Sequence, residues 1–252
     1  MRRGPALAAA LVLSACSGSA ASDGTDAEQA VLRVLAAASL TEAFTEMESV
    51  YEDTYPDIDV QTSYDSSAVL AQQVLEGAPA DVLATADEVT MARVTDEGLA
   101  EPQPFATNTL TLVTPADDPG DVAGITDLDS DAVSFAVCVP DAPCGQAAQQ
   151  LLTLAGVDAA PTTEQEDVKS VLTQVTSGQV DAGLVYVTDA RAAGDAVRTV
   201  DVDDASEVVN SYPITVVSDS SRPQAAAGWV ELVTSVQGRR VLASYGFGPP
   251  AT

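Results

Sequence analysis

The chain has 252 residues and a formal net charge of −28 at pH 7. So large a negative charge repels nucleic acid phosphates and anionic lipid head groups, which excludes both as direct partners. The sequence contains no histidine. This excludes Ser-His-Asp and Cys-His nucleophilic machinery and removes the commonest metal ligand.

The N-terminus has the pattern of an export signal. Two arginines precede a short apolar run, and Leu13-Ser14-Ala15-Cys16 then matches a lipobox, at which bacteria cleave the chain and acylate the cysteine. We expect a lipoprotein signal peptide over 1–15, a lipid on Cys16 and a flexible tether over 16–30. A plain secretory signal is the alternative. Either one predicts a mature protein outside the cytoplasmic membrane, or in a periplasm.

Strand-like and helix-like patterns alternate along the rest of the chain. We expect strands over 31–35, 58–62, 81–84, 108–114, 133–139, 183–187, 199–202 and 212–217. We expect helices over 40–50, 68–76, 88–97, 146–154, 168–176, 224–236 and 238–245. Such alternation predicts an α/β protein with largely parallel sheets.

Four residues stand at the starts of predicted helices. Ser39 and Ser67 lie where a strand gives way to a helix, and Cys144 and Val168 lie at the N-termini of two further helices. Ser39 and Glu42 have the spacing of a capping box, and Asp167 is a good cap for the fourth helix. Each helix start offers unpaired N–H groups and the positive end of a helix dipole. If the four starts meet at one place, they form an anion site. Four ordinary capped helices are the alternative.

Cys138 and Cys144 are separated by a short loop that two prolines stiffen. In an exported chain, so close a pair favours a disulfide. A mononuclear metal site needs more cysteine or histidine ligands than the chain contains. We therefore predict a Cys138–Cys144 disulfide and no metal centre.

Nine short motifs, in this order and spacing, resemble the periplasmic molybdate-binding proteins of ABC transporters. The motifs are Ala36-Ala37-Ala38-Ser39-Leu40, Ser66-Ser67-Ala68-Val69-Leu70-Ala71, Gly77-Ala78-Pro79-Ala80-Asp81-Val82, Asn108-Thr109-Leu110, Pro143-Cys144-Gly145, Glu166-Asp167-Val168, Gly183-Leu184-Val185-Tyr186 with Asp189, Tyr212-Pro213-Ile214 and Tyr245-Gly246-Phe247. The resemblance covers about 31–248. Each motif alone is a weak indicator of this family, but the order and spacing of all nine together are specific to it.

The resemblance implies a two-lobed type II periplasmic-binding-protein fold, in which each lobe is a mainly parallel sheet flanked by helices. Lobe 1 would comprise 31–107 and 214–252, and lobe 2 would comprise 108–213. The chain would cross between the lobes near Thr107-Asn108 and Pro213.

The resemblance also implies a ligand shell for a molybdate or tungstate oxyanion. Ser39 and Ser67 would each donate a hydroxyl and a backbone N–H, Cys144 and Val168 a backbone N–H, and Tyr186 its phenol. Cys144 departs from the family pattern, which has alanine there. A backbone donor tolerates this change, and a disulfide would tie the binding loop to Cys138.

The implied function is capture of the oxyanion by lobe closure and delivery to the permease of an ABC importer. The protein would act as a monomer without a cofactor, and it would touch the membrane only through Cys16. Sulfate is an alternative ligand because it has the same charge and shape. An enzyme on the same scaffold and an adhesion domain are the competing classes. We expect no catalytic residues, since no activated nucleophile pair can be named.

Overall fold

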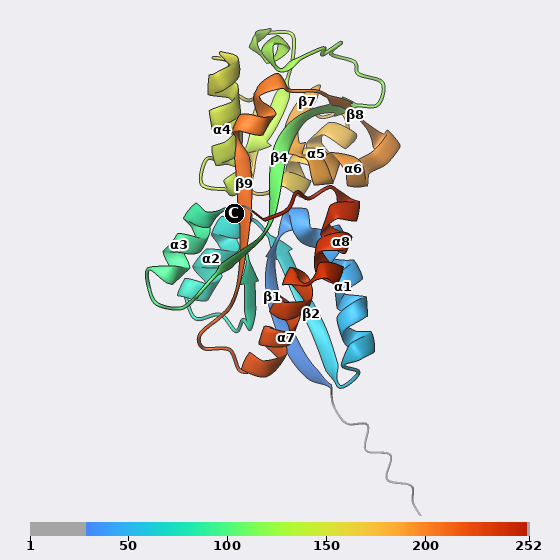
Figure 1. Cartoon of the computed structure of the whole chain (residues 1–252). Coiled ribbons are helices and arrows are strands. Elements are labelled where there is room, and N and C mark those ends of the chain that lie inside the picture. The colour runs from blue at the N-terminus through green and yellow to red at the C-terminus, as the bar shows by residue number, and fades with distance from the viewer. Residues whose placement is uncertain (1–28, 251–252) are drawn as a thin grey trace, which may run out of the picture.

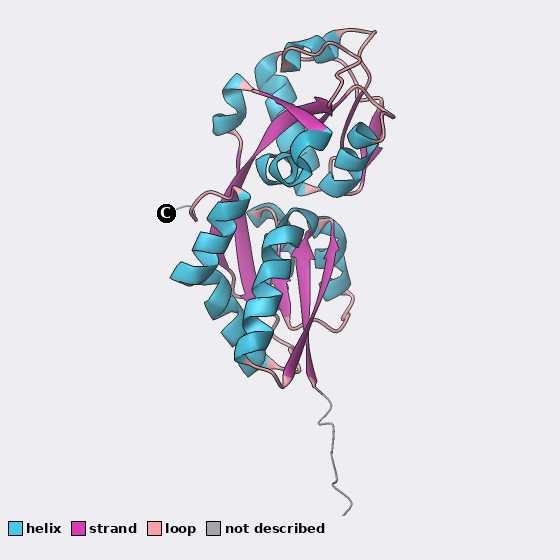
Figure 2. Cartoon of the chain, turned by 90° about the vertical axis from the view of Figure 1, so that its right-hand side faces the viewer, coloured by secondary structure: helices cyan, strands magenta, loops and turns pink. Residues whose placement is uncertain are grey.

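The computed structural model describes residues 29–250, which form two α/β halves stacked one on the other (Figures 1 and 2). The predicted signal peptide, Cys16 and nearly all of the predicted tether lie outside these residues. None of the helices over 29–250 combines the length and the apolar character needed to cross a membrane.

The first half is built on three parallel strands, in the order β2-β1-β3. Its elements are β1 (Ala30–Ala37), the 3-10 helix η1 (Ala38–Leu40), α1 (Thr41–Thr54), β2 (Ile58–Asp65), α2 (Ser67–Leu75), β3 (Val82–Ala84), α3 (Glu88–Thr95), α7 (Pro223–Thr234) and α8 (Val236–Tyr245). Neighbouring residues of a strand point to opposite faces of a sheet. Accordingly, Val34 of β1 joins the core beneath α1 and α7, whereas Leu35 packs with residues of α2 and α3.

The second half has its own three parallel strands, in which β5 pairs with β6 and β7. Its elements are η2 (Ile125–Asp129), β5 (Phe135–Cys138), α4 (Pro143–Ala155), β6 (Thr163–Gln165), α5 (Val168–Thr176), β7 (Ala182–Tyr186), α6 (Val187–Ala193), η3 (Gly194–Ala196), β8 (Val197–Val200) and η4 (Asp203–Glu207).

Two strands, β4 (Gln103–Pro115) and β9 (Val209–Val216), run between the halves (Figure 1). Residues 103–109 of β4 pair antiparallel with β9, whose far end pairs with β3. From Leu110 onward, β4 pairs instead with β7 and β8 of the second half. The long strand β4 therefore belongs to both sheets and changes partner after Thr109.

The predicted α/β architecture is confirmed, with three corrections of detail. β4 begins at Gln103, five residues before the predicted strand, because its early part pairs with β9. β6 and α6 are absent from the sequence prediction, which assigned Val187 to a strand, although it begins α6. Both elements are too short to show a clear apolar period. The exact lobe boundaries stay a prediction.

A row of aromatic rings leads from the core of the first half to the junction of the two halves. Ring centroids lie 5.5 Å apart between Trp229 and Phe44, 6.1 Å between Phe44 and Phe105, and 6.2 Å between Phe105 and Tyr212. Tyr212 in turn lies 6.0 Å from Tyr186 at the end of β7. The Phe44–Phe105 pair is tilted and the other three pairs are edge-on. Edge-on aromatic pairs are favourable and directional, so the contact with Tyr212 helps to hold Tyr186 in place.

Candidate binding site

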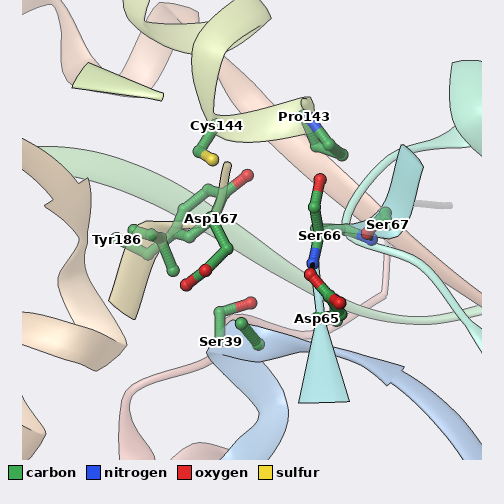
Figure 3. A pocket seen from close by; sticks show the side chains of 12 residues that line it. Ser39, Asp65, Ser66, Ser67, Pro143, Cys144, Asp167 and Tyr186 are labelled. Carbon is green, nitrogen blue, oxygen red and sulfur yellow. Dashed lines mark hydrogen bonds between the residues drawn. The ribbon is translucent and has the colours of Figure 1, made fainter. Parts of the chain in front are cut away.

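A small cavity of about 20 Å³ lies where the two halves meet. It is lined by Ala37, Ala38, Ser39, Asp65, Ser66, Ser67, Ala86, Pro143, Cys144, Asp167, Val168 and Tyr186. All five residues of the predicted ligand shell are among them. Figure 3 shows Ser39 and Ser67 on segments of the first half, facing Cys144 and Tyr186 on segments of the second half.

The four predicted helix starts meet at this cavity. Ser67, Cys144 and Val168 lie in the first turns of α2, α4 and α5, and Ser39 lies in the short helix η1. The first N–H groups of a helix have no acceptor within that helix. The cavity is therefore surrounded by backbone donors and by the positive ends of helices, which is an environment that favours an anion.

The Ser67 hydroxyl is held by a backbone donor. The N–H of Ala86 donates to Ser67 Oγ over 2.9 Å, and the serine is almost wholly buried. Because this contact occupies a lone pair of the oxygen, the hydroxyl proton stays available to the cavity.

The prediction that Ser39 and Glu42 form a capping box is wrong. Ser39 makes no side-chain cap, and its Oγ lies 2.9 Å from the hydroxyl oxygen of Tyr212. The Glu42 carboxylate instead accepts hydrogen bonds from Lys169. Tertiary partners from β9 and α5 thus replace the local capping partners.

Tyr186 presents a buried phenol to the cavity. Its side chain is 1% exposed, and its hydroxyl has no hydrogen-bond partner within residues 29–250. Burial raises the pKa of Tyr186 well above its ordinary value, and the neighbouring Tyr212 adds to this shift. The phenol therefore stays protonated, and its proton lacks an acceptor. A buried hydroxyl proton without an acceptor destabilises the folded protein unless a bound ligand accepts the hydrogen bond.

The predicted Cys138–Cys144 disulfide is present, with Cα atoms 5.7 Å apart. It ties the first turn of α4 to the end of β5. The next residue, Gly145, sits so close to the loop that a Cβ there would lie 1.9 Å from the carbonyl oxygen of Val139. Disulfide and glycine together place the N–H of Cys144 beside the cavity.

Two carboxylates near the cavity are engaged by their own helices. Asp167 caps α5, as predicted, by accepting from the N–H groups of Lys169 and Ser170 at 2.8 and 3.0 Å. Asp65 Oδ1 accepts from the N–H of Ser66 at 2.7 Å. Asp167 therefore stabilises the start of α5, whereas Asp65 holds the N–H of Ser66, the residue before α2.

A charged cluster beside the cavity was missed by the sequence prediction. Lys169 Nζ of α5 lies 2.6 Å from Glu42 Oε1 of α1 and 2.9 Å from Asp189 Oδ1 of α6. Burial raises the pKa of Asp189 to about 6, even though the positive charge of Lys169 lowers it. The cluster joins the two halves. Two features of the sequence pointed to it: Lys169 is the only lysine in the chain, and Asp189 belongs to one of the nine motifs.

A second ion pair joins the halves away from this cluster. The guanidinium of Arg93, on α3, donates to both carboxylate oxygens of Asp141 at 2.7 and 3.1 Å. The pKa of Asp141 is lowered by this hydrogen bond and by the charge of Arg93. Both side chains are well exposed, so the pair adds little to stability.

Two α/β halves around a small cavity walled by helix starts define a two-lobed ligand-binding protein. A family model described as bacterial extracellular solute-binding protein matches residues 32–248, and the chain belongs to this family. Its members bind solutes, and the chain is a solute-binding protein rather than an enzyme.

Individual relatives agree with this family. The molybdate-binding protein ModA of Mycobacterium tuberculosis (strain H37Rv) is 39% identical over 219 residues, which are 86% of this chain and 84% of ModA. The putative ABC transporter substrate-binding lipoprotein YvgL of Bacillus subtilis is 31% identical, and the matched region spans 96% of this chain and 95% of YvgL. The periplasmic molybdate-binding protein of Azotobacter vinelandii superimposes with a TM-score of 0.78 at 20% identity, over 87% of this chain and 100% of its own. This last match bears on the fold, which is two-lobed.

Proposed function

We propose that the protein captures molybdate or tungstate between its lobes and delivers the oxyanion to the permease of an ABC importer. The observation that carries the proposal is the buried Tyr186 hydroxyl, which faces the cavity without a partner in the described chain. The similarity to the molybdate-binding protein ModA of Mycobacterium tuberculosis supports molybdate as the ligand.

The proposed shell consists of donors alone. Ser39 and Ser67 contribute hydroxyl and N–H groups from lobe 1, while Cys144 and Val168 contribute N–H groups and Tyr186 its phenol from lobe 2. Charge-assisted hydrogen bonds of this kind are each worth roughly 1.5–3 kcal/mol. Because both lobes supply donors, the closed form binds the anion more tightly than an open form does. That difference in affinity drives closure.

A shell of donors favours an oxyanion that carries no proton. Near neutral pH, phosphate often keeps one proton, which needs an acceptor. The engagement of Asp167 by its own helix supports this selectivity, since both of its carboxylate oxygens already accept hydrogen bonds. Sulfate has the charge and shape of molybdate and is the alternative ligand. We propose that the size of the closed cavity discriminates against it.

The proposal includes export and anchoring. A signal peptide over 1–15 would be removed, and an acylated Cys16 with a tether over 16–30 would hold the protein at the outer face of the membrane. The description of YvgL as a lipoprotein supports this part. Lobe 1 would comprise 31–107 and 214–252, lobe 2 would comprise 108–213, and the protein would act as a monomer.

Calorimetric titration of the processed protein tests the ligand. Molybdate, tungstate, sulfate and phosphate are titrated separately under one set of conditions. We expect tight binding of molybdate or tungstate, weaker binding of sulfate and the weakest binding of phosphate. Tight sulfate binding with none of molybdate would overturn the assignment.

Thermal unfolding with and without molybdate provides an independent test of ligand binding. A ligand present at a hundred times its dissociation constant stabilises the folded state by about 2.7 kcal/mol. If the protein were an adhesion domain, none of the four anions would raise its melting temperature.

A further inference from the structure

We infer that Asn108 and Tyr212, which lie behind the proposed ligand shell, orient the Ser39 hydroxyl as a donor to the cavity and thereby disfavour protonated oxyanions. The inference rests on the proposed oxyanion function and names positioning residues for that site. Both residues are buried, and both lie on the strands that join the two halves.

The orientation of the Asn108 amide is fixed by a backbone donor. The N–H of Thr109 donates to Asn108 Oδ1 over 3.0 Å, so the oxygen must lie on that side. The Nδ2 group then faces Thr188 Oγ1 at 2.9 Å and the hydroxyl oxygen of Tyr212 at 3.5 Å. An amide NH₂ carries two donors and accepts nothing. Asn108 therefore donates to both hydroxyls.

The Tyr212 hydroxyl accepts a hydrogen bond from Asn108 and, in turn, donates one to Ser39. A phenol has one proton, and its oxygen already receives the amide of Asn108. The shortest hydrogen bond of the Tyr212 hydroxyl joins it to Ser39 Oγ at 2.9 Å. If Ser39 donated in this contact, the buried Tyr212 proton would lose its nearest acceptor, which is unfavourable. The phenol therefore donates to Ser39.

Ser39 is left with its own proton pointing away from Tyr212. Since Ser39 lines the cavity, this proton is available to a ligand there. Ser67 is in the same position, because its oxygen already receives the N–H of Ala86. Groups outside the shell thus favour both serines as donors to the cavity. Each oxygen keeps a second lone pair, but accepting a ligand proton there would turn the serine's own proton away from the ligand and leave it without an acceptor, which is unfavourable.

The comparison that isolates this effect is molybdate against hydrogen phosphate at about pH 8. Both ions then carry two negative charges, so that the proton of hydrogen phosphate is their main difference in hydrogen bonding. The measured quantity is the ratio of the phosphate dissociation constant to the molybdate dissociation constant. A general loss of packing or an added charge changes both constants together and leaves the ratio nearly constant.

Asn108→Asp reverses the chain of donors. A carboxylate at this position accepts from Tyr212, so Ser39 donates to Tyr212 and turns a lone pair toward the cavity. We expect both anions to bind more weakly and the ratio to fall at least tenfold. Tyr212→Phe removes the donor to Ser39 without adding charge, and we expect the ratio to fall at least threefold. It serves as the second variant if Asn108→Asp does not fold.

Asn210→Asp is the matched control. Asn210 lies opposite Asn108 in the β4–β9 register, is also buried, and donates to the carbonyl oxygen of Ala86 rather than to a hydroxyl. The same new charge at this position should weaken the binding of both anions without changing the ratio of their dissociation constants. An unchanged ratio in Asn108→Asp and Tyr212→Phe, with molybdate still bound by the unmodified protein, would overturn the inference alone. Failure of the unmodified protein to bind any oxyanion would overturn the proposed function as well.

Discussion

Replacing Lys169 by methionine probes the buried charged cluster beside the cavity. Asp189 is fully buried, and Lys169 is its positive partner at 2.9 Å. Without the amine, the carboxyl can avoid a buried charge by taking up a proton. Relative to its ordinary pKa of 3.8, protonation at about pH 7.5 costs about 5 kcal/mol, at about 1.36 kcal/mol per pH unit.

The unmodified protein already bears part of this cost. A pKa of about 6 for Asp189 corresponds to about 3 kcal/mol, which leaves about 2 kcal/mol for the substitution to add. Loss of the partly exposed Glu42–Lys169 pair adds up to about 1 kcal/mol. We therefore expect Lys169→Met to lower the free energy of unfolding by about 2–3 kcal/mol at about pH 7.5.

The effect should shrink in acid. The pKa of Asp189 is raised in the folded protein, so the folded state binds the proton more readily than the unfolded state between pH 3.8 and about 6. The penalty from this residue is present above about pH 6 and is relieved as the pH falls through that value. At about pH 5 the carboxyl is mostly protonated with or without the lysine, and Lys169→Met should cost less than about 1 kcal/mol.

Urea unfolding of both proteins at the two pH values measures this difference. The double variant Lys169→Met/Asp189→Asn removes the carboxyl as well, and it should recover most of the lost stability at the higher pH. An equal loss at both pH values, or no recovery in the double variant, would refute the reasoning.

Three further predictions concern the cavity itself. Tyr186→Phe should weaken molybdate binding roughly ten- to a hundredfold in calorimetry without lowering thermal stability, because the lost hydroxyl has no partner in the described chain; a lower melting temperature with unchanged affinity contradicts its role. Ser67→Ala should weaken the binding of molybdate at least tenfold, while circular dichroism should show an intact fold. An unchanged affinity would mean that Ser67 is not part of the site. Replacing Cys138 and Cys144 by serine should lower the free energy of unfolding by about 2 kcal/mol in urea titrations, since the closed loop is short; no loss would mean that the disulfide adds nothing to stability.

Local patterns were sufficient to find the helix starts that line the cavity. Asp167 caps α5 as its sequence position indicates, and Cys144 opens α4 after a proline. These features are readable because a cap and its helix lie within a few residues of each other. Whether these starts meet at one place was left open by the local patterns, and the family resemblance implied that they do.

The partners of the site residues were not predictable in the same way. Ser39 bonds Tyr212 across 173 residues, and Lys169 bonds Glu42 across 127. No spacing rule links positions so far apart. The predicted capping box does not form because Tyr212 and Lys169 bind the side chains that it would need, those of Ser39 and Glu42. These tertiary contacts outweigh a local cap, which is worth about 1 kcal/mol.

Asp189 shows the same limit at a buried position. It lies in α6, a helix of seven residues that follows β7 without a linker. An aspartate in the first turn of a short helix is ordinarily an exposed dipole partner. Only the fold shows that α6 places this carboxyl in the core against the one lysine of the chain.

The row of aromatic rings gives the protein an internal fluorescent reporter. Trp229 is the only tryptophan in the sequence, it is wholly buried, and Tyr51 lies 5.6 Å from it. Every photon emitted by an indole therefore comes from one known place in the first half. Unfolding exposes that indole to water and shifts its emission to the red. An oxyanion bound as proposed, beside Tyr186, would lie at the opposite end of the row of aromatic rings and would leave the indole buried. The colour of the tryptophan emission should therefore report unfolding without responding to binding.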